Sequence, residues 1–170
     1  ANIRFGIVDD YRDIEVFTTL PDTVFGSRFV TLAPEHPLEE SLVAGGEQEA
    51  AWKALYDEVA SMAEFDRIKN MNKKKGVFSG RYAIHPLTGE HVPIWIGNFV
   101  IATYGTGAVM AVPAHDERDH DFAKQYGIPI KRVLVMEEGG NPDAPVDSAE
   151  VDLGWMVNSP LDGFDGLHGS

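Results

Sequence analysis

Cysteine is missing from all 170 residues of the sequence. Its absence excludes disulfides, thiolate nucleophiles and cysteine-ligated zinc or iron–sulfur sites. No apolar run approaches the ~20 residues that a membrane-spanning helix needs, and the first residues do not combine a basic region with an apolar stretch. We therefore expect a soluble, unprocessed chain with no membrane partner, for which a cytoplasmic location fits.

Positive charge is also scarce, because 14 Lys and Arg residues stand against 27 Asp and Glu residues, for a formal net charge of −13. This balance argues against a broad electrostatic grip on nucleic acid, which depends on cations that neutralise phosphates. If RNA is a partner, only a small part of it should be held here. One dense basic patch, typical of a solvated loop between two elements and broken by residues 70–72, comprises Arg67, Lys69, Lys73, Lys74 and Lys75.

The hydrophobic content of 44% is sufficient for a compact core, and we expect a single domain over residues 1–170. Residues 137–152, rich in Gly, Pro, Asp and Glu, should form a loop within it. β-Branched and aromatic residues predict strands at 14–19, 27–33, 99–103 and 131–136, and a hairpin that pairs 81–85 with 91–96. Apolar periodicity and turn residues predict a helical turn at 20–26, a short helix at 36–44 and an amphipathic helix from Trp52 to Ala63. Many short strands with a few helices indicate a mixed α/β (α+β) fold with a barrel-like β core and flanking helices.

The most informative stretch runs from Tyr104 to Asp119. Its glycines give the backbone freedom, an apolar strand follows, and Pro113 ends that strand. Asp116 is then positioned to cap a helix that continues to Gly127. Functional residues concentrate at strand-to-helix junctions of this kind.

Asp116 and Asp119 are three residues apart, so they lie on the same side of the first turn of this helix. One interpretation is structural: Asp116 is the N-cap, Asp119 completes a variant of the capping box, and the helix dipole favours both charges. The other is functional: one carboxylate faces a cleft and binds an ammonium group as a charge-assisted acceptor. The two interpretations are compatible.

A weaker pattern is a group of residues that could hold a divalent metal, namely His115, Asp116, Asp119, His120 and Asp121. Adjacent residues on a helix point in different directions, so these side chains cannot all converge on one ion. Near the other end of the chain, Thr18, Thr19 and Thr23 offer three hydroxyls around one turn. Threonine is also common in strands because of its β-propensity, so these hydroxyls are either structural or functional.

Four motifs in this order resemble the editing domain of bacterial-type leucyl-tRNA synthetases. The resemblance extends over nearly the whole chain, from Ile14 to Leu167. The motifs are Thr18-Thr19-Leu20-Pro21-Asp22-Thr23, Leu32-Ala33-Pro34-Glu35-His36-Pro37-Leu38, His85-Pro86-Leu87-Thr88-Gly89-Glu90, and residues 105–116 followed by Arg118-Asp119.

The resemblance implies the editing-domain fold and hydrolysis of the ester between a noncognate amino acid and the terminal adenosine of leucine tRNA. It implies catalytic positions at Thr18, Thr19 and Asp119, with Asp119 holding the α-ammonium group and the threonines near the scissile ester. Thr23 matches the residue that blocks leucine. The remaining substrate-binding positions are Tyr104, Met110, Val112, His115 and Asp116.

The implied partners are the 3′ end of leucine tRNA carrying a noncognate amino acid and the rest of the synthetase chain. Editing of this kind requires no metal or other cofactor, whereas the parent enzyme uses ATP and Mg for aminoacylation. The His-Ile-Gly-His and Lys-Met-Ser-Lys-Ser signatures of aminoacylation are absent.

The sequence departs from the family at Leu20, where the family usually has arginine, and leucine cannot pair with phosphate. This departure leads to an alternative hypothesis, in which the domain only docks the tRNA end or another protein and has lost its catalysis. A metal-dependent hydrolase based on residues 115–121 is the third hypothesis.

Overall fold

The computed structural model describes residues 1–70 and 73–169, and its internal contacts divide the chain into two compact units. The β-sheet unit comprises Asn2–Phe17 and Phe29–Val109. The α4 unit comprises Ala1, Thr18–Arg28 and the chain from Met110 onward. None of the described helices is long and apolar enough to cross a membrane.

The sheet is mixed and open, with the strand order β2-β1-β4-β5-β3-β6 and with β2 and β6 as its edge strands. Its strands are β1 (Asn2–Ile7), β2 (Asp13–Phe17), β3 (Phe29–Leu32), β4 (Gly76–Ile84), β5 (His91–Gly97) and β6 (Ala108–Ala111). β5 runs antiparallel to β4 and parallel to β3. The predicted mixed α/β class is confirmed, although the sheet is not a closed barrel.

The strands form where apolar residues recur at every second position. In β5, Val92, Ile94 and Ile96 are buried, as the two-residue period of a strand requires. The predicted hairpin is confirmed, with Ala83 opposite Val92. β1, which pairs antiparallel with β2, was not predicted from the sequence.

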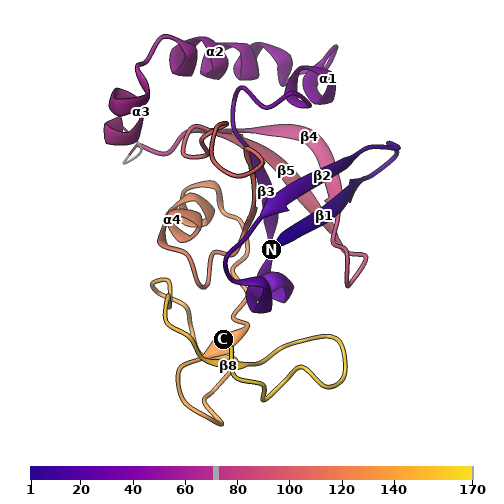
Figure 1. The fold of residues 1–170 in the computed structure, drawn as a ribbon, viewed down its shortest axis with the longest axis vertical. Helices are drawn as coiled ribbons and strands as arrows, with labels where there is room; N and C mark the ends of the chain where they lie inside the picture. The colour runs from indigo at the N-terminus through magenta and orange to yellow at the C-terminus, as the bar shows by residue number, and fades with distance from the viewer. Residues whose placement is uncertain (71–72, 170) are drawn as a thin grey trace. The chain divides into compact units, whose positions relative to one another are not determined.

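Three helices of the β-sheet unit follow one another above β4 in Figure 1: α1 (Glu39–Val43), α2 (Glu49–Ala60) and α3 (Glu64–Asn70). The predicted amphipathic helix is confirmed as α2, which buries Leu55 and Val59 in a cluster with Val43 and Ile96. Trp52 packs against this cluster from the same helix. The helix ends at Ala60, before the last residues of the predicted apolar stripe.

The strand predicted at 99–103 is wrong, because this segment forms turns. The N–H of Val100 donates to the carbonyl of Gly97 at 3.3 Å, and the N–H of Tyr104 donates to the carbonyl of Ile101 at 3.1 Å. Hydrogen bonds of this i to i+3 type reverse the chain. Phe99 and Val100 are buried in the core, at 3% and 5% exposure. Their apolar character therefore reflects core packing and does not indicate a strand.

The solvated-loop interpretation of the basic patch is wrong for Arg67, which lies on α3 and is buried. Its guanidinium binds the carboxylate of Glu35 and donates to the carbonyl of Val100 at 2.7 Å. Lys75 pairs with Glu58 at 2.7 Å. Residues 71–72, which interrupt the patch, lie outside the described residues. Arg67 is therefore not available to phosphate, whereas Lys75 is exposed.

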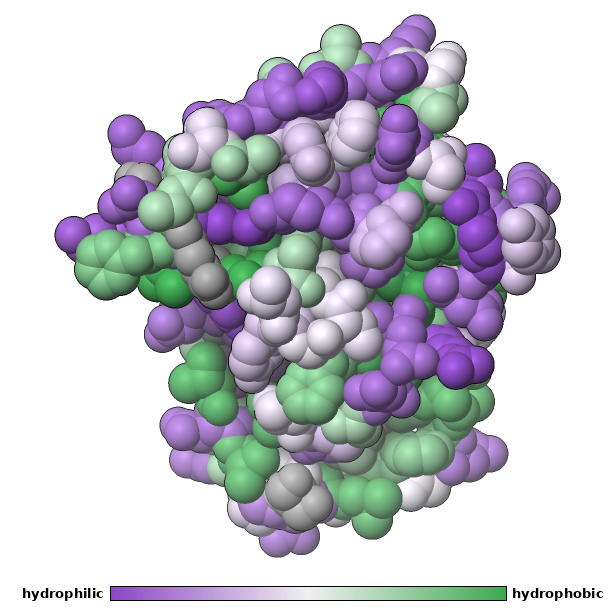
Figure 2. All heavy atoms as spheres, turned by 45° about the horizontal axis from the view of Figure 1, so that its top comes forward, coloured by the Kyte–Doolittle hydropathy of each residue, from purple (hydrophilic) through white to green (hydrophobic). Residues whose placement is uncertain are grey.

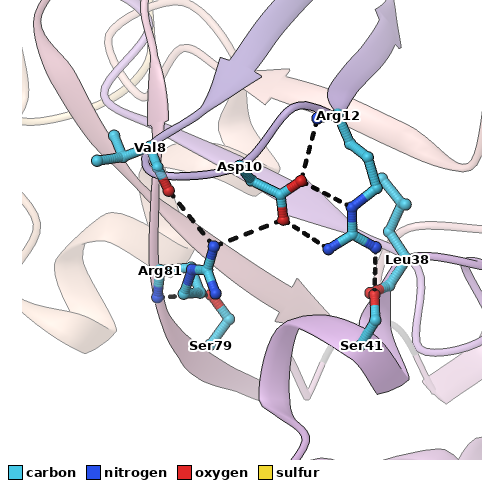
Figure 3. Close-up of polar contacts among 7 residues, drawn as sticks. All are labelled: Val8, Asp10, Arg12, Leu38, Ser41, Ser79 and Arg81. Carbon is cyan, nitrogen blue, oxygen red and sulfur yellow. Dashed lines mark hydrogen bonds and ion pairs between the residues drawn. The ribbon is translucent and has the colours of Figure 1, made fainter.

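An ion-pair cluster fixes the turn between β1 and β2 (Figure 3). Asp10 accepts two hydrogen bonds from the guanidinium of Arg12, at 2.9 and 2.6 Å, and lies 3.6 Å from Arg81 on β4. The hydrogen bonds from Arg12 hold the pKa of Asp10 well below its usual range. Arg12 also donates to the hydroxyl of Ser41 at 2.6 Å, which ties this turn to α1.

The α4 unit contains little regular structure: a 3₁₀ helix, η1 (Pro21–Gly26), the helix α4 (Glu117–Tyr126), and the two-residue strands β7 (Leu134–Val135) and β8 (Trp155–Met156). The helical turn predicted at 20–26 is confirmed as η1. The strand predicted at 131–136 is reduced to β7, and the N–H groups of Val133 and Leu134 donate to a histidine ring. Between β7 and β8 the chain contains no helix or strand.

Candidate active site

The threonine segment leaves β2 and folds back on itself through its own hydroxyls. Thr18 Oγ1 accepts a hydrogen bond from the N–H of Leu20 at 3.1 Å. Thr23 Oγ1 donates to the carbonyl of Leu20 at 2.8 Å, and the Thr23 N–H reaches the same carbonyl at 3.2 Å. Thr23 is buried, at 2% exposure, whereas Thr19 is exposed. The Thr23 hydroxyl is therefore used in a hydrogen bond within the turn. This hydrogen bond fixes the direction of the Thr23 methyl group.

Asp116 caps α4 as predicted. Its backbone is extended, with φ −137° and ψ 126°, and its Oδ1 accepts from the N–H groups of Arg118 at 2.9 Å and Asp119 at 3.1 Å. The helix ends at Gly127, which has the left-handed φ of 67° that suits glycine. Both ends of α4 are thus determined by residues that the sequence identifies.

Asp119 lies in the first turn of α4 and is 94% buried, at 6% relative exposure. Its Oδ2 accepts a hydrogen bond from the N–H of Val112 at 2.8 Å, while the N–H of Asp116 donates to the carbonyl of Val112. This arrangement differs from the predicted capping box, in which Asp119 would bind the N–H of Asp116. The carboxylate is instead held rigidly between the end of β6 and the positive end of the helix dipole.

The end of η1 and the residues at the end of β6 contact each other inside the α4 unit. The N–H of Arg28 donates to the carbonyl of Ala111 at 3.0 Å. Gly26, at the end of η1, is so close to Val112 that a Cβ there would lie 3.0 Å from the valine Cγ1. Since Asp119 binds the N–H of Val112, this valine contacts both the first turn of α4 and the end of η1, three residues beyond the first sequence motif.

His115 is buried and uses both ring nitrogens on the backbone. Its Nε2 accepts from the N–H groups of Val133 at 3.2 Å and Leu134 at 3.1 Å, and its Nδ1 lies 2.9 Å from the carbonyl of Glu150. Because an N–H can only donate, Nε2 is unprotonated and Nδ1 carries the hydrogen. Burial lowers the pKa of His115 and favours this neutral form. The ring therefore joins the strand-to-helix junction to β7 and to the following loop.

Sequence reasoning missed the buried Arg132. Its guanidinium binds the carboxylate of Glu150 and donates to the carbonyl of Pro145 at 3.1 Å, so it anchors the loop after β7. An arginine inside an apolar stretch was the available signal. Asp22 was also missed, although it lies within the threonine motif. Neither of its carboxylate oxygens, both buried, has a hydrogen-bond partner among the described residues.

The remaining predicted substrate-binding residues divide between the two units. Met110 is buried and, with Val112, belongs to the α4 unit, as do the predicted threonines and aspartates. Tyr104 belongs to the β-sheet unit, is 68% exposed and contacts the ring of Phe17 edge-on, with ring centroids 6.3 Å apart. The α4 unit thus contains every predicted site residue except Tyr104.

The residues of the alternative metal-site hypothesis do not converge. Across residues 1–70 and 73–169, no group of three His, Cys, Asp or Glu side chains could hold a metal ion. Both ring nitrogens of His120 face backbone carbonyls, of Pro113 at 2.9 Å and Asp147 at 3.1 Å. With the His115 ring also bound to the backbone, neither histidine is placed as a ligand.

Comparisons with known proteins relate this chain to the aminoacyl-tRNA synthetases. A solved ternary complex of Agrobacterium radiobacter K84 agnB2 LeuRS with tRNA and LeuAMS matches 86% of this chain and 17% of its own, with a TM-score of 0.69 and 32% identity. Leucine–tRNA ligases of Nitratidesulfovibrio vulgaris Hildenborough and Clostridium perfringens SM101 are each 45% identical over 98% of this chain.

The family model for the leucyl-tRNA synthetase editing domain matches residues 1–170. The chain therefore belongs to the family of leucyl-tRNA synthetase editing domains, as the resemblance predicted. It spans about a fifth of the length of the two ligases, of which it covers 20%.

Proposed function

We propose that this chain hydrolyses the ester bond between a noncognate amino acid and the terminal adenosine of leucine tRNA, and spares leucyl-tRNA. The observation that carries the proposal is the buried carboxylate of Asp119, which the N–H of Val112 holds in place at the first turn of α4. A fixed anion of this kind suits the α-ammonium group of an aminoacyl ester. Membership of the editing-domain family supports the same reaction.

Such a site answers a general limit on selectivity. An aminoacylation pocket discriminates against an amino acid smaller by one methylene by only about 1–3 kcal/mol of binding free energy. A second, hydrolytic site is therefore needed. That site must exclude the correct product. Thr23 serves as the block in this proposal, because its hydroxyl bond to Leu20 fixes its methyl in one position.

Hydrolysis needs a positioned water near the scissile carbonyl, and no covalent intermediate is invoked. Thr18 and Thr19 are the hydroxyls proposed to orient the ester and the water. The exposed Thr19 is accessible to substrate, whereas Thr18 also holds the turn through Leu20. Orientation and hydrogen bonding would supply most of the acceleration.

The proposed partners are the 3′ end of leucine tRNA and the rest of the synthetase. The structural neighbour is a synthetase in complex with tRNA, which supports both partners. The net charge of −13 fits a domain that binds only the tRNA terminus and relies on the parent enzyme for the remaining affinity. The proposed location is the cytoplasm, and editing is proposed to need no cofactor.

Replacing Asp119 in the parent synthetase tests the proposal directly. Asp119→Asn keeps an oxygen acceptor for the N–H of Val112 and removes the charge, so the fold should be retained. Loss of a charge-assisted contact of about 1.5–3 kcal/mol should slow deacylation of isoleucyl-tRNA by about 10- to 150-fold. Thermal unfolding of the same variant is the control. Unchanged hydrolysis in a folded Asp119→Asn enzyme would contradict the assignment.

The blocking role of Thr23 has its own set of variants. Thr23→Ser keeps the hydroxyl and loses the methyl, whereas Thr23→Val keeps the branched shape and loses the hydrogen bond to Leu20. We expect Thr23→Ser and Thr23→Ala to release leucine from leucyl-tRNA, and Thr23→Val to spare it. If leucyl-tRNA stays charged in all three variants, the block lies elsewhere.

The two rivals predict different results. A docking domain without catalysis would show no deacylation under any condition, even though it bound tRNA. A metal-dependent hydrolase would lose activity when a chelator is added. The proposed mechanism predicts full deacylation in the presence of a chelator, measured on pre-charged tRNA so that aminoacylation, which uses ATP and Mg, does not interfere.

A further inference from the structure

The β-sheet unit contains a pocket whose lining includes none of the residues proposed for editing. Its volume is about 570 Å³, within the range of small-molecule sites. The segment after β3 and the starts of α1 and α2 form it, and its lining includes Glu35, Glu40, Glu49, Trp52, Lys53 and Tyr56. Hydrophilic side chains predominate on the surface over these helices (Figure 2).

Two aromatic rings one helical turn apart form a wall of this pocket. Trp52 and Tyr56 on α2 have ring centroids 5.6 Å apart and planes inclined by 44°. The indole N–H of Trp52 donates to the buried carboxyl of Glu39 at 2.8 Å, which fixes the ring orientation. The ammonium of Lys53 lies 5.2 Å from the Tyr56 ring centroid, so this face already attracts a cation.

The charge of the pocket is negative. Glu40 and Glu49 form no ion pair within the described part of the chain, and Glu49 is held in place by the N–H of Gly45 at 2.7 Å. The Lys53 ammonium is bound by Asp57 outside the pocket lining and does not neutralise these carboxylates. An aromatic wall beside unneutralised carboxylates is complementary to an organic cation.

We propose that this pocket binds an extended organic cation with two or more ammonium groups, of the polyamine class. The two carboxylates without an ion pair among the described residues come from different helices, Glu40 from α1 and Glu49 from α2, so each can bind one ammonium group of such a molecule. Aromatic faces attract weakly hydrated organic cations, and among residues 1–70 and 73–169 no cluster is suited to a metal ion.

The test is calorimetric titration of the 170-residue chain with spermidine at constant ionic strength. The variant Glu40→Gln/Glu49→Gln removes both charges and keeps the side-chain volumes and an acceptor for Gly45. Glu47→Gln is the matched control, because Glu47 is an exposed carboxylate of the same loop region outside the pocket lining. Tyr56→Leu and Tyr56→Phe form a second pair that removes or keeps the aromatic ring.

We expect saturable binding of one spermidine, weakened at least 10-fold in Glu40→Gln/Glu49→Gln and less than 2-fold in Glu47→Gln. Tyr56→Leu should weaken it about 2- to 5-fold, and Tyr56→Phe should restore it. Equal weakening by Glu47→Gln would show diffuse charge attraction and overturn the proposal, as would tighter binding of Mg²⁺ than of spermidine. Argininamide is titrated in parallel, and tighter binding of argininamide than of spermidine would overturn the assignment to a polyamine.

Discussion

Glu39 provides a sensitive test of the packing around α1 and α2. The side chain is completely buried, and burial is the main cause that raises its pKa from 4.5 to about 9. Glu35 raises it further, while the hydrogen bond from Trp52 and the charge of Arg67 lower it. At neutral pH the folded protein therefore keeps a proton that the unfolded chain has released.

The sign of the effect follows from this difference in bound protons. A group with a raised pKa in the folded state contributes stability that is present below its unfolded pKa and is lost as the pH rises through its folded pKa. For Glu39 this window runs from pH 4.5 to about 9. Within it, the free energy of unfolding should fall by up to about 1.4 kcal/mol per pH unit.

Glu39→Gln removes this titration and keeps the volume and an oxygen that accepts from the indole N–H of Trp52. We expect the stability of the variant relative to the wild type to increase by up to about 3 kcal/mol between pH 6 and pH 8. Urea unfolding followed by circular dichroism, repeated at each pH, measures the difference. Glu40→Gln, at the exposed neighbouring position, should show no such trend. Parallel pH profiles of wild type and Glu39→Gln would refute the reasoning.

Two further predictions concern the α4 unit. Asp116→Ala should lower the free energy of unfolding by about 1 kcal/mol, because two N–H groups of α4 lose their acceptor, and Asp116→Asn should restore most of it in the same urea titration. The lowered pKa of His115 contributes stability that is present above its ordinary pKa of about 6.5 and is lost as the pH falls below it, so His115→Gln should flatten the acid side of the stability profile. An unchanged acid limb in that variant would contradict the neutral, backbone-bound ring.

Elements with local signals could be predicted from the sequence. α4 was found because its boundaries depend on Asp116 and Gly127, which act through their own backbone surroundings. The hairpin of β4 and β5 was found because its strands alternate and its turn is short. In contrast, the turns at 98–107 have an apolar composition like that of a strand, so the sequence could not distinguish the two. The apolar residues Phe99 and Val100 are instead buried in the folded core.

The candidate site shows the same division between local and distant contacts. Asp119 and Val112 are seven residues apart, and the sequence pointed to both. The contacts of His115 connect it to residues 18, 19 and 35 positions away, so its structural role depends on the topology of the unit. A sequence motif therefore identifies which residue is a candidate for the site. The hydrogen-bond partners of that residue can be read only from the folded structure.

Leu20 is the position at which this chain departs from the arginine that is usual in the family. Its backbone supports the threonine turn, because its N–H binds Thr18 and its carbonyl accepts twice from Thr23. Leu20→Arg should therefore fold with a stability within about 0.5 kcal/mol of the wild type. The added guanidinium can pair with a phosphate near the tRNA end, which leucine cannot do.

One such phosphate contact should steepen the dependence of deacylation on salt. For single-stranded RNA, the slope of log kcat/KM against log salt concentration should become more negative by about 0.7, and the rate at low salt should rise. Leu20→Gln, which is polar and uncharged, separates the effect of charge from that of polarity. If Leu20→Arg and wild type show the same slope, position 20 does not face the RNA backbone, and editing in this chain does not depend on the family's arginine contact.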